Sequence, residues 1–302
     1  MKNLTQMSEN KINIVGKLLD VVVADGKLGD GRYYERATMT VRVNQTYNDN
    51  QEISEIPISV FATQYTKNNT INPAYENLQH LKAMKTVQGY GEAEADVVRI
   101  SGASISENNF VAKSGNLING WQIRSSFINK AGQVQDIASF NIDIFILDMH
   151  SELNSEGEET GRLIVKGAIV QYGGVVDVLE FVVEGADRIN YVERNWNIND
   201  TVNIGGRIRV TSKEDTRPAS TSSWGEELPE TTTRMIRELV ITRGSDEPFE
   251  EDFAYDPAEI KKGFNVRKAK IEQMQVDAKN AAGRGAAKTA ATQQTSSKYS
   301  WE

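Results

Sequence analysis

Residues 97–147 decide the fold, and they read VVRISGASISENNFVAKSGNLINGWQIRSSFINKAGQVQDIASFNIDIFIL. The stretch opens with a short apolar strand that ends at Gly102, where a missing side chain permits a bulge or a bend. Apolar and polar residues alternate between Trp121 and Phe127, which is typical of a sheet with one dry and one wet face. A second alternating strand follows at residues 140–146. The order predicts a strand, a long hairpin and a strand that closes a small β-barrel.

Three more strands and one helix precede this stretch. The strands are predicted at residues 11–18, 38–43 and 56–60, and Asn72 followed by Pro73 is a typical start of a helix. Three strands, a helix and two more strands with a large hairpin is the order of the five-stranded Greek-key barrel called the OB-fold.

Much of this order recurs later in the chain, after an acidic segment. The recurring segments are strands at residues 162–169, 175–183, 202–210 and 235–242, with a short helix or loop at residues 186–195. Residues 162–169 resemble residues 11–18 down to the glycine, which indicates an internal repeat. The predicted fold class is therefore all-β, with two tandem OB-fold barrels, a C-terminal helix and a flexible tail.

The predicted domains follow from this repeat. Residues 1–150 are assigned to the first barrel and residues 151–244 to the second. Residues 245–302 are assigned to an acidic segment, an amphipathic helix and a disordered tail.

Composition limits the class of protein. The 302 residues contain no cysteine, 39% are hydrophobic, and no window approaches eighteen consecutive apolar residues. Disulfides and thiolate metal sites are therefore excluded, and no membrane span or secretory signal is predicted. The expected location is the cytoplasm, which would be the host cytoplasm for a phage protein.

The net charge of −8 is unevenly distributed. Residues 1–136 have 14 basic and 14 acidic side chains, residues 137–244 have 11 and 18, and residues 245–257 have none and six. A nearly neutral first half is able to present a basic stripe to nucleic acid, whereas the acidic segment would repel DNA or compete for its site.

The order of strands resembles that of bacterial and phage single-stranded DNA-binding proteins. Two barrels with a helical tail are similar to the tandem forms of some phages and plasmids, and the resemblance covers roughly residues 10–244. It implies a non-enzymatic protein that coats single-stranded DNA in phage replication or recombination. The family usually ends in an acidic tip with proline and phenylalanine, whereas this sequence carries a similar composition internally, at residues 246–253.

Single-strand binding needs cations for phosphates and flat rings for unpaired bases. The candidate residues of the first repeat are Tyr33, Tyr34, Arg36, Arg42, Phe61, Tyr65, Phe110, Lys113, Trp121 and Arg124. The alternative for Phe61, Phe110 and Trp121 is a place in the barrel core. Arg207 and Arg209 share one strand face in the second repeat, which we expect to assist the first barrel or to contact protein because it is acidic.

Signals for catalysis are absent from the sequence. His80 and His150 are the two histidines, and there is no phosphate-binding loop, nucleophile elbow or paired-histidine metal motif. We therefore expect no enzymatic activity, cofactor or metal.

The tail supplies candidate partner-binding residues, namely Phe249, Phe253, Phe264 and Ile271. The stripe that contains Phe264 and Ile271 would pack on the second barrel or bind a partner, including another copy of the chain in a homo-oligomer. Residues 257–282 are predicted to be helical. Gly263 weakens the first turn, so the dependable part of the helix is expected to begin near Asn265, and the helix is expected to stop at Gly283. Three alternatives remain for the acidic segment: imitation of DNA in the strand-binding groove, docking of a replication or recombination protein, and a solvated linker.

A second functional class also fits the sequence. A structural or adaptor protein of a phage particle would use tandem barrels and net acidity for protein contacts. RNA binding is a weaker variant, because nothing in the sequence indicates recognition of a 2′-hydroxyl group.

Overall fold

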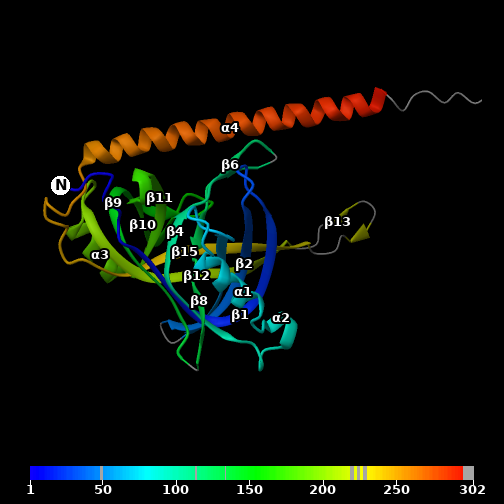
Figure 1. The fold of residues 1–302 in the computed structure, drawn as a ribbon. Helices are drawn as coiled ribbons and strands as arrows, with labels where there is room; N and C mark the ends of the chain where they lie inside the picture. Colours follow the sequence, from blue (N-terminus) through cyan, green and yellow to red (C-terminus); the bar gives the residue numbers. More distant parts are fainter. Residues whose placement is uncertain are drawn as a thin grey trace, which may run out of the picture.

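The computed structural model describes residues 1–47, 50–112, 114–132, 134–217, 221–222, 225–226 and 230–294. The first half contains eight strands and two helices (Figure 1). These are β1 (Asn10–Lys27), β2 (Tyr33–Tyr47), β3 (Asn50–Thr63), α1 (Pro73–Lys82), α2 (Val87–Tyr90), β4 (Val97–Glu107), β5 (Phe110–Val111), β6 (Leu117–Ile118), β7 (Trp121–Arg124) and β8 (Ile128–Ala131).

The second half contains the remaining strands and helices. These are β9 (Ile137–Leu153), β10 (Glu159–Val170), the 3₁₀ helix η1 (Tyr172–Gly174), β11 (Val176–Glu184), α3 (Ala186–Asn195), β12 (Thr201–Arg217), β13 (Thr221–Ser222), β14 (Gly225–Glu226), β15 (Glu230–Gly244) and α4 (Pro257–Gln294). Eleven strands from both halves form one continuous sheet.

The first barrel closes through five strands. Strand β1 pairs antiparallel with β2 and with β4, and β2 pairs antiparallel with β3. Strand β7 completes the ring, because it pairs parallel with β3 and antiparallel with β4. With α1 between β3 and β4, this is the predicted OB-fold.

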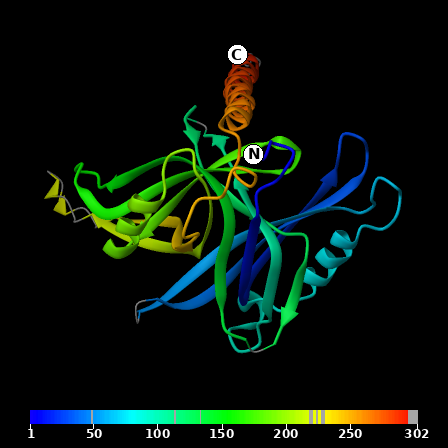
Figure 2. The ribbon, with the colours of Figure 1, turned by 90° about the vertical axis from the view of Figure 1, so that its left-hand side faces the viewer.

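The second barrel repeats the same pairing with β9, β10, β11, β12 and β15. Strand β9 pairs antiparallel with β10 and β12, β10 pairs antiparallel with β11, and β15 joins β11 in parallel and β12 in antiparallel pairing. Helix α3 lies between β11 and β12, where α1 lies in the first barrel. The all-β fold with two OB-type barrels and a C-terminal helix is thus confirmed, and Figure 2 shows the barrels side by side.

The pairing changes the roles of two predicted strands. The first barrel is closed by β7, which begins at Trp121, and not by the alternating segment at residues 140–146. That segment belongs to β9, the first strand of the second barrel. Residues 162–169, which resemble the first strand in sequence, lie in the second strand, β10. The boundary predicted at residue 150 therefore falls inside β9, and we place the division between the barrels ahead of Ile137.

Strand alternation builds the core. Buried side chains from both barrels form one contiguous cluster, which includes Ile58 and Ile123 of the first barrel and Phe181 and Leu239 of the second. In β7, Trp121 and Ile123 are buried while their neighbours are more exposed, as the period of two predicts.

A cap and a close approach fix local geometry in the first barrel. The Asn72 side chain accepts a hydrogen bond from the Ala74 amide at 3.0 Å, which confirms the predicted start of α1. Strand β1 passes from β4 to β2 at Gly16, where a Cβ would lie 2.2 Å from the carbonyl oxygen of Arg42. Only glycine permits this approach of two backbones.

The C-terminal helix packs against the second barrel (Figure 1). Ile260 and Phe264 join a small apolar cluster that includes Val176. Helix α4 begins at Pro257, as the helical pattern predicts, so the expectation that its dependable part begins only near Asn265 is wrong. A Cβ at Gly263 would lie 2.2 Å from Val176 Cγ2, so this glycine allows close packing instead of weakening the turn.

The end of the helix also differs from the prediction. Helix α4 continues past Gly283 to Gln294, and residues 295–302 of the predicted tail lie outside the described chain. Within the described residues, no helix combines the length and apolar character needed to span a membrane.

Replacement of Gly16 tests the backbone approach. Gly16→Ala should lower the free energy of unfolding by about 1–3 kcal/mol, the usual cost of overpacking, because its new methyl group would meet the Arg42 carbonyl. Urea denaturation measures the change. Gly29→Ala is the control, since a Cβ at Gly29 meets nothing within 4 Å; equal stability of the two variants would contradict the close-approach argument.

Candidate functional site

A groove of about 1020 Å³ runs across the outer face of the first barrel. Its walls come from the C-terminal half of β1, from β2, β3, β4 and β7, and from the loop that follows β7. The lining residues are Val22, Ala24, Arg36, Ala37, Thr38, Ser59, Val60, Phe61, Ser101, Gly102, Ser104, Gln122, Arg124, Ser125, Ser126 and Phe127.

Strand register brings three predicted site residues together in this groove. Arg36 on β2 pairs directly with Phe61 on β3, and Ser59, two residues before Phe61, pairs with Arg124 on β7. All of these side chains lie on the outer face, because they alternate with buried residues along each strand. Residues 88 positions apart in sequence thereby share one surface.

The groove is cationic although the whole chain is acidic. Its lining contains two arginines and no aspartate or glutamate. Among the residues that the structure describes, neither Arg36 nor Arg124 forms an ion pair. Arg42, on the same strand as Arg36, is instead paired with Glu55 at 3.0 Å and with Glu92 at 3.1 Å. The groove therefore keeps two positive charges available for an anion.

Two aromatic rings are accessible at the groove. Phe61 and Phe127 are each 52% exposed. The Phe61 ring lies 5.2 Å from the Tyr34 ring, centroid to centroid, at an interplanar angle of 35°. Phe127 was missed by the sequence analysis, because β7 ends at Arg124 and the alternation that predicted a buried Phe127 ends with it.

Tyr33 lies outside the groove and belongs to a polar cluster around Glu35. Glu35 is 5% exposed, and its carboxylate accepts hydrogen bonds from Tyr33 and from Tyr75, Gln79 and Lys82 of α1. Burial and the nearby carboxylates raise the pKa of Tyr33 to about 12. Tyr33 thus helps to hold α1 on the barrel.

Other predicted residues of the first repeat are scattered around it. Tyr65 is 43% exposed and lines a separate pocket with Lys67. Phe110 lines a cavity beside α4. Trp121 is buried, as its core alternative predicted, and the Arg237 guanidinium lies 4.2 Å from its ring centroid. Lys113 lies outside the described residues.

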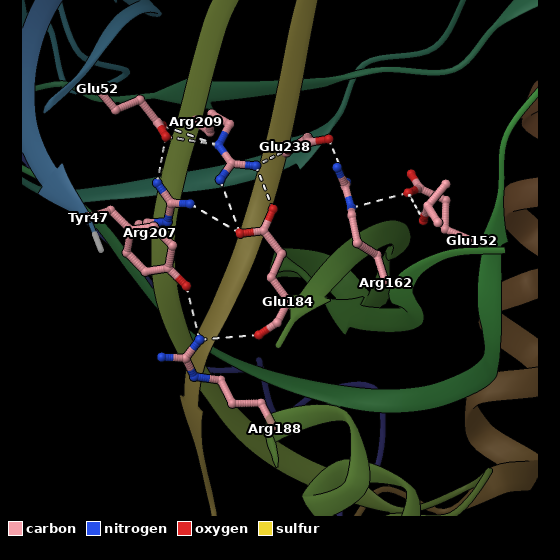
Figure 3. A network of polar contacts seen from close by, with 10 residues as sticks. Tyr47, Glu52, Glu152, Arg162, Glu184, Arg188, Arg207, Arg209 and Glu238 are labelled. Carbon is pink, nitrogen blue, oxygen red and sulfur yellow. Dashed lines mark hydrogen bonds and ion pairs between the residues drawn. The ribbon is translucent and has the colours of Figure 1, made fainter. Parts of the chain in front are cut away.

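Arg207 and Arg209 lie in a network of ion pairs rather than in the groove (Figure 3). Arg207 is 7% exposed and pairs with Glu52 at 2.9 Å. Arg209 pairs with Glu184 at 2.7 Å and with Glu238 at 2.6 Å. Burial favours loss of charge from Arg209, but the hydrogen bonds that it donates to these carboxylates outweigh burial and raise its pKa. Both arginines therefore belong to this network and do not line the groove.

The acidic segment follows the second barrel. The Phe249 amide donates to the Thr201 carbonyl at 2.8 Å, and the Tyr191 hydroxyl donates to the Asp246 carbonyl at 3.1 Å. No residue of this segment lines the groove, so the structure gives no support to imitation of DNA there. Phe253 is 61% exposed.

The two partner candidates on α4 contact the rest of the chain. Phe264 packs on the second barrel, and Ile271 lines the same cavity as Phe110. Among the described residues, no group of three or more histidine, aspartate or glutamate side chains is arranged to hold a metal ion.

Comparison with known proteins gives a family. A protein-family model described as YorF matches residues 8–277, most of the sequence. The chain belongs to the YorF family. No curated protein sequence matches this YorF-family chain.

Two solved structures are similar to the YorF-family chain. One is the wild-type single-stranded DNA binding protein from Thermus aquaticus, with 9% sequence identity, a TM-score of 0.49, and coverage of 81% of this chain and 95% of that chain. The other is a deletion mutant of the same Thermus aquaticus protein, with 11% identity, a TM-score of 0.48, and coverage of 81% and 97%.

The Glu35 cluster generates a pH prediction. Burial raises the pKa of Glu35, but hydrogen bonds from Gln79 and Lys82 and the Lys82 charge outweigh it, so the folded-state pKa lies below its usual value. The ionised carboxylate therefore stabilises the fold above the unfolded pKa of about 4.3, and this stabilisation is lost as the pH falls through the lower folded pKa.

Glu35→Gln should cost about 1.5–3 kcal/mol at pH 7, the usual worth of hydrogen bonds to a charged group. The difference from the wild type should shrink in acid, which denaturant melts between pH 7 and pH 3 would measure. Glu55→Gln is the control, because the Glu55 side chain is 47% exposed. If the loss of unfolding free energy caused by Glu35→Gln is constant over this pH range, ionisation of Glu35 does not contribute to stability.

Proposed function

We propose that this protein binds single-stranded DNA in the groove of the first barrel. The observation that carries the proposal is the composition of the groove: two arginines without carboxylate partners beside two exposed phenylalanine rings. Arg36 and Arg124 supply charge for phosphates, and Phe61 and Phe127 supply flat faces for bases.

The exposed rings favour a single strand over a duplex. Stacking on a protein ring requires a base with a free face, and the bases of a duplex already stack on one another. Hydroxyl groups of Ser59, Ser101 and Ser104 line the same groove and are able to donate hydrogen bonds to phosphate oxygens. Stacking and phosphate contacts do not depend on which base is bound, so we propose binding with little sequence preference.

Titration of labelled oligothymidine and of a duplex at several salt concentrations tests the proposal. Arg36→Ala and Arg124→Ala should each flatten the dependence of log K on log salt by roughly 0.7, because each removes one phosphate contact on a single strand. Phe61→Ala should weaken binding by about 1–3 kcal/mol with little change in that slope, because stacking releases no counterions.

Matched controls are available elsewhere on the chain. Lys261→Ala removes an exposed positive charge on α4, and Phe253→Ala removes an exposed ring from the acidic segment. Neither should change the affinity or the slope. The proposal fails if the wild type does not bind the single strand at low salt, if it binds the duplex more tightly, or if the controls lose as much affinity as the groove variants.

The finer proposal is that the protein coats single strands during phage DNA replication or recombination. The resemblance of strand order to phage and bacterial single-stranded DNA-binding proteins supports it. A replication protein should be essentially absent from purified phage particles, which mass spectrometry measures. Stoichiometric amounts in particles would favour the structural or adaptor role instead.

A further inference from the structure

The second barrel has a face that corresponds to the groove. The match follows from strand pairing together with which side chains face away from the core: Ser59 pairs with Thr38 and Arg124 in the first barrel, and Val182, which also lies outside the main core cluster, pairs with Ile164 and Val240 in the second. Two residues further along each ladder, Arg162 lies opposite Glu184, where the first barrel has Arg36 opposite Phe61.

The chemistry at the matched positions differs. The exposed ring of Phe61 corresponds to the carboxylate of Glu184, and Arg124, which forms no ion pair among the described residues, corresponds to the buried apolar side chain of Val240. The second face therefore lacks both the ring and the free cation that make the groove suitable for a nucleotide.

The arginines that this face does carry are already paired. Arg162 pairs with Glu238 at 2.6 Å, and Arg209 pairs with Glu184 and Glu238, all within the second barrel (Figure 3). Both Arg207 and Arg209 also pair with Glu52, which lies on β3 of the first barrel. The nitrogen-to-oxygen distances are 2.9 Å for Arg207 and 3.2 Å for Arg209.

The β2–β3 hairpin of the first barrel also covers this face. The Tyr47 ring lies over the Arg207 guanidinium at 3.6 Å, and the Tyr47 hydroxyl accepts a hydrogen bond from Arg188 at 2.9 Å. The Val210 amide donates to the Ser54 hydroxyl at 3.2 Å, and Ser54 is 2% exposed. The Glu52 carboxylate and the Tyr47 ring thus occupy the second face. They are the same kinds of group as the phosphate and the base of a nucleotide.

We propose that single-stranded DNA contacts only the first barrel, and that the matching face of the second barrel is the docking surface of the β2–β3 hairpin. This inference rests on the proposed function. The same two strands carry Arg36 and Phe61 at the opposite end of the hairpin, so docking of the Tyr47 end holds the groove's strands in place. Glu52, Arg207 and Arg209 are then positioning residues, and they make no DNA contact.

The test uses the full chain and oligothymidines of increasing length at several salt concentrations. Glu52→Gln is the first variant, because it keeps the shape of the side chain while removing the charge that holds Arg207 and Arg209 from the first barrel. This variant should leave unchanged both the slope of log K against log salt concentration and the number of nucleotides bound per protein. A flatter slope or a shorter occluded site would overturn the inference, because the variant would then have lost phosphates that the wild type binds on this face.

Arg209→Gln is the second variant, checked for folding by a cooperative thermal melt. The slope should again stay at the wild-type value, whereas a decrease of roughly 0.7 would place a phosphate on Arg209 and overturn the inference. If Arg209→Gln does not fold because it leaves buried carboxylates unpaired, Glu52→Gln decides alone.

The two proposals fail in different ways. Absence of binding by the wild type overturns the proposed function, and the inference with it. Binding that depends on Arg36 and Arg124 but also on Arg209 would keep the proposed function and overturn the one-barrel inference.

Discussion

The arrangement of the two barrels depends on strand β9, because a strand can form backbone hydrogen bonds along only two edges. A strand has two edges, and residues 139–142 of β9 use both, with β1 on one edge and β12 on the other. Further along, β10 takes over from β1 on the same edge. The first barrel is therefore attached to the second by the strand that begins the second, which explains why eleven strands form one sheet and the barrels share a core cluster.

Attachment through β9 places a hairpin of one barrel against the face of the other. The β2–β3 hairpin then meets Arg207 and Arg209, and Glu52 and Tyr47 satisfy them. Buried charges destabilise a fold unless they are paired, and the carboxylates on the second face supply these pairs. The groove of the first barrel has no such neighbour. Its arginines remain in solvent, where an unpaired charge costs little, and they stay available to a ligand.

Local sequence patterns predicted the elements more successfully than their pairing. Alternation located β2, β7 and β9, and Asn72 with Pro73 located the start of α1, because inward side chains and end caps are fixed by near neighbours in sequence. Alternation does not say which strand lies on each edge. That is why residues 140–146 were assigned to closure of the first barrel, although the short β7 performs it.

The sequence by itself determined the all-β class, the repeat, and the residue types able to bind a single strand. The tertiary structure alone decided which of them meet. Arg36, Phe61 and Arg124 share a groove, Trp121 is buried under Arg237, and Arg207 is paired with Glu52, 155 residues away. The physical reason is that an arginine's availability depends on the charge beside it in space. In this fold that charge comes from a distant strand, whose place is set by hydrogen-bond register rather than by local sequence.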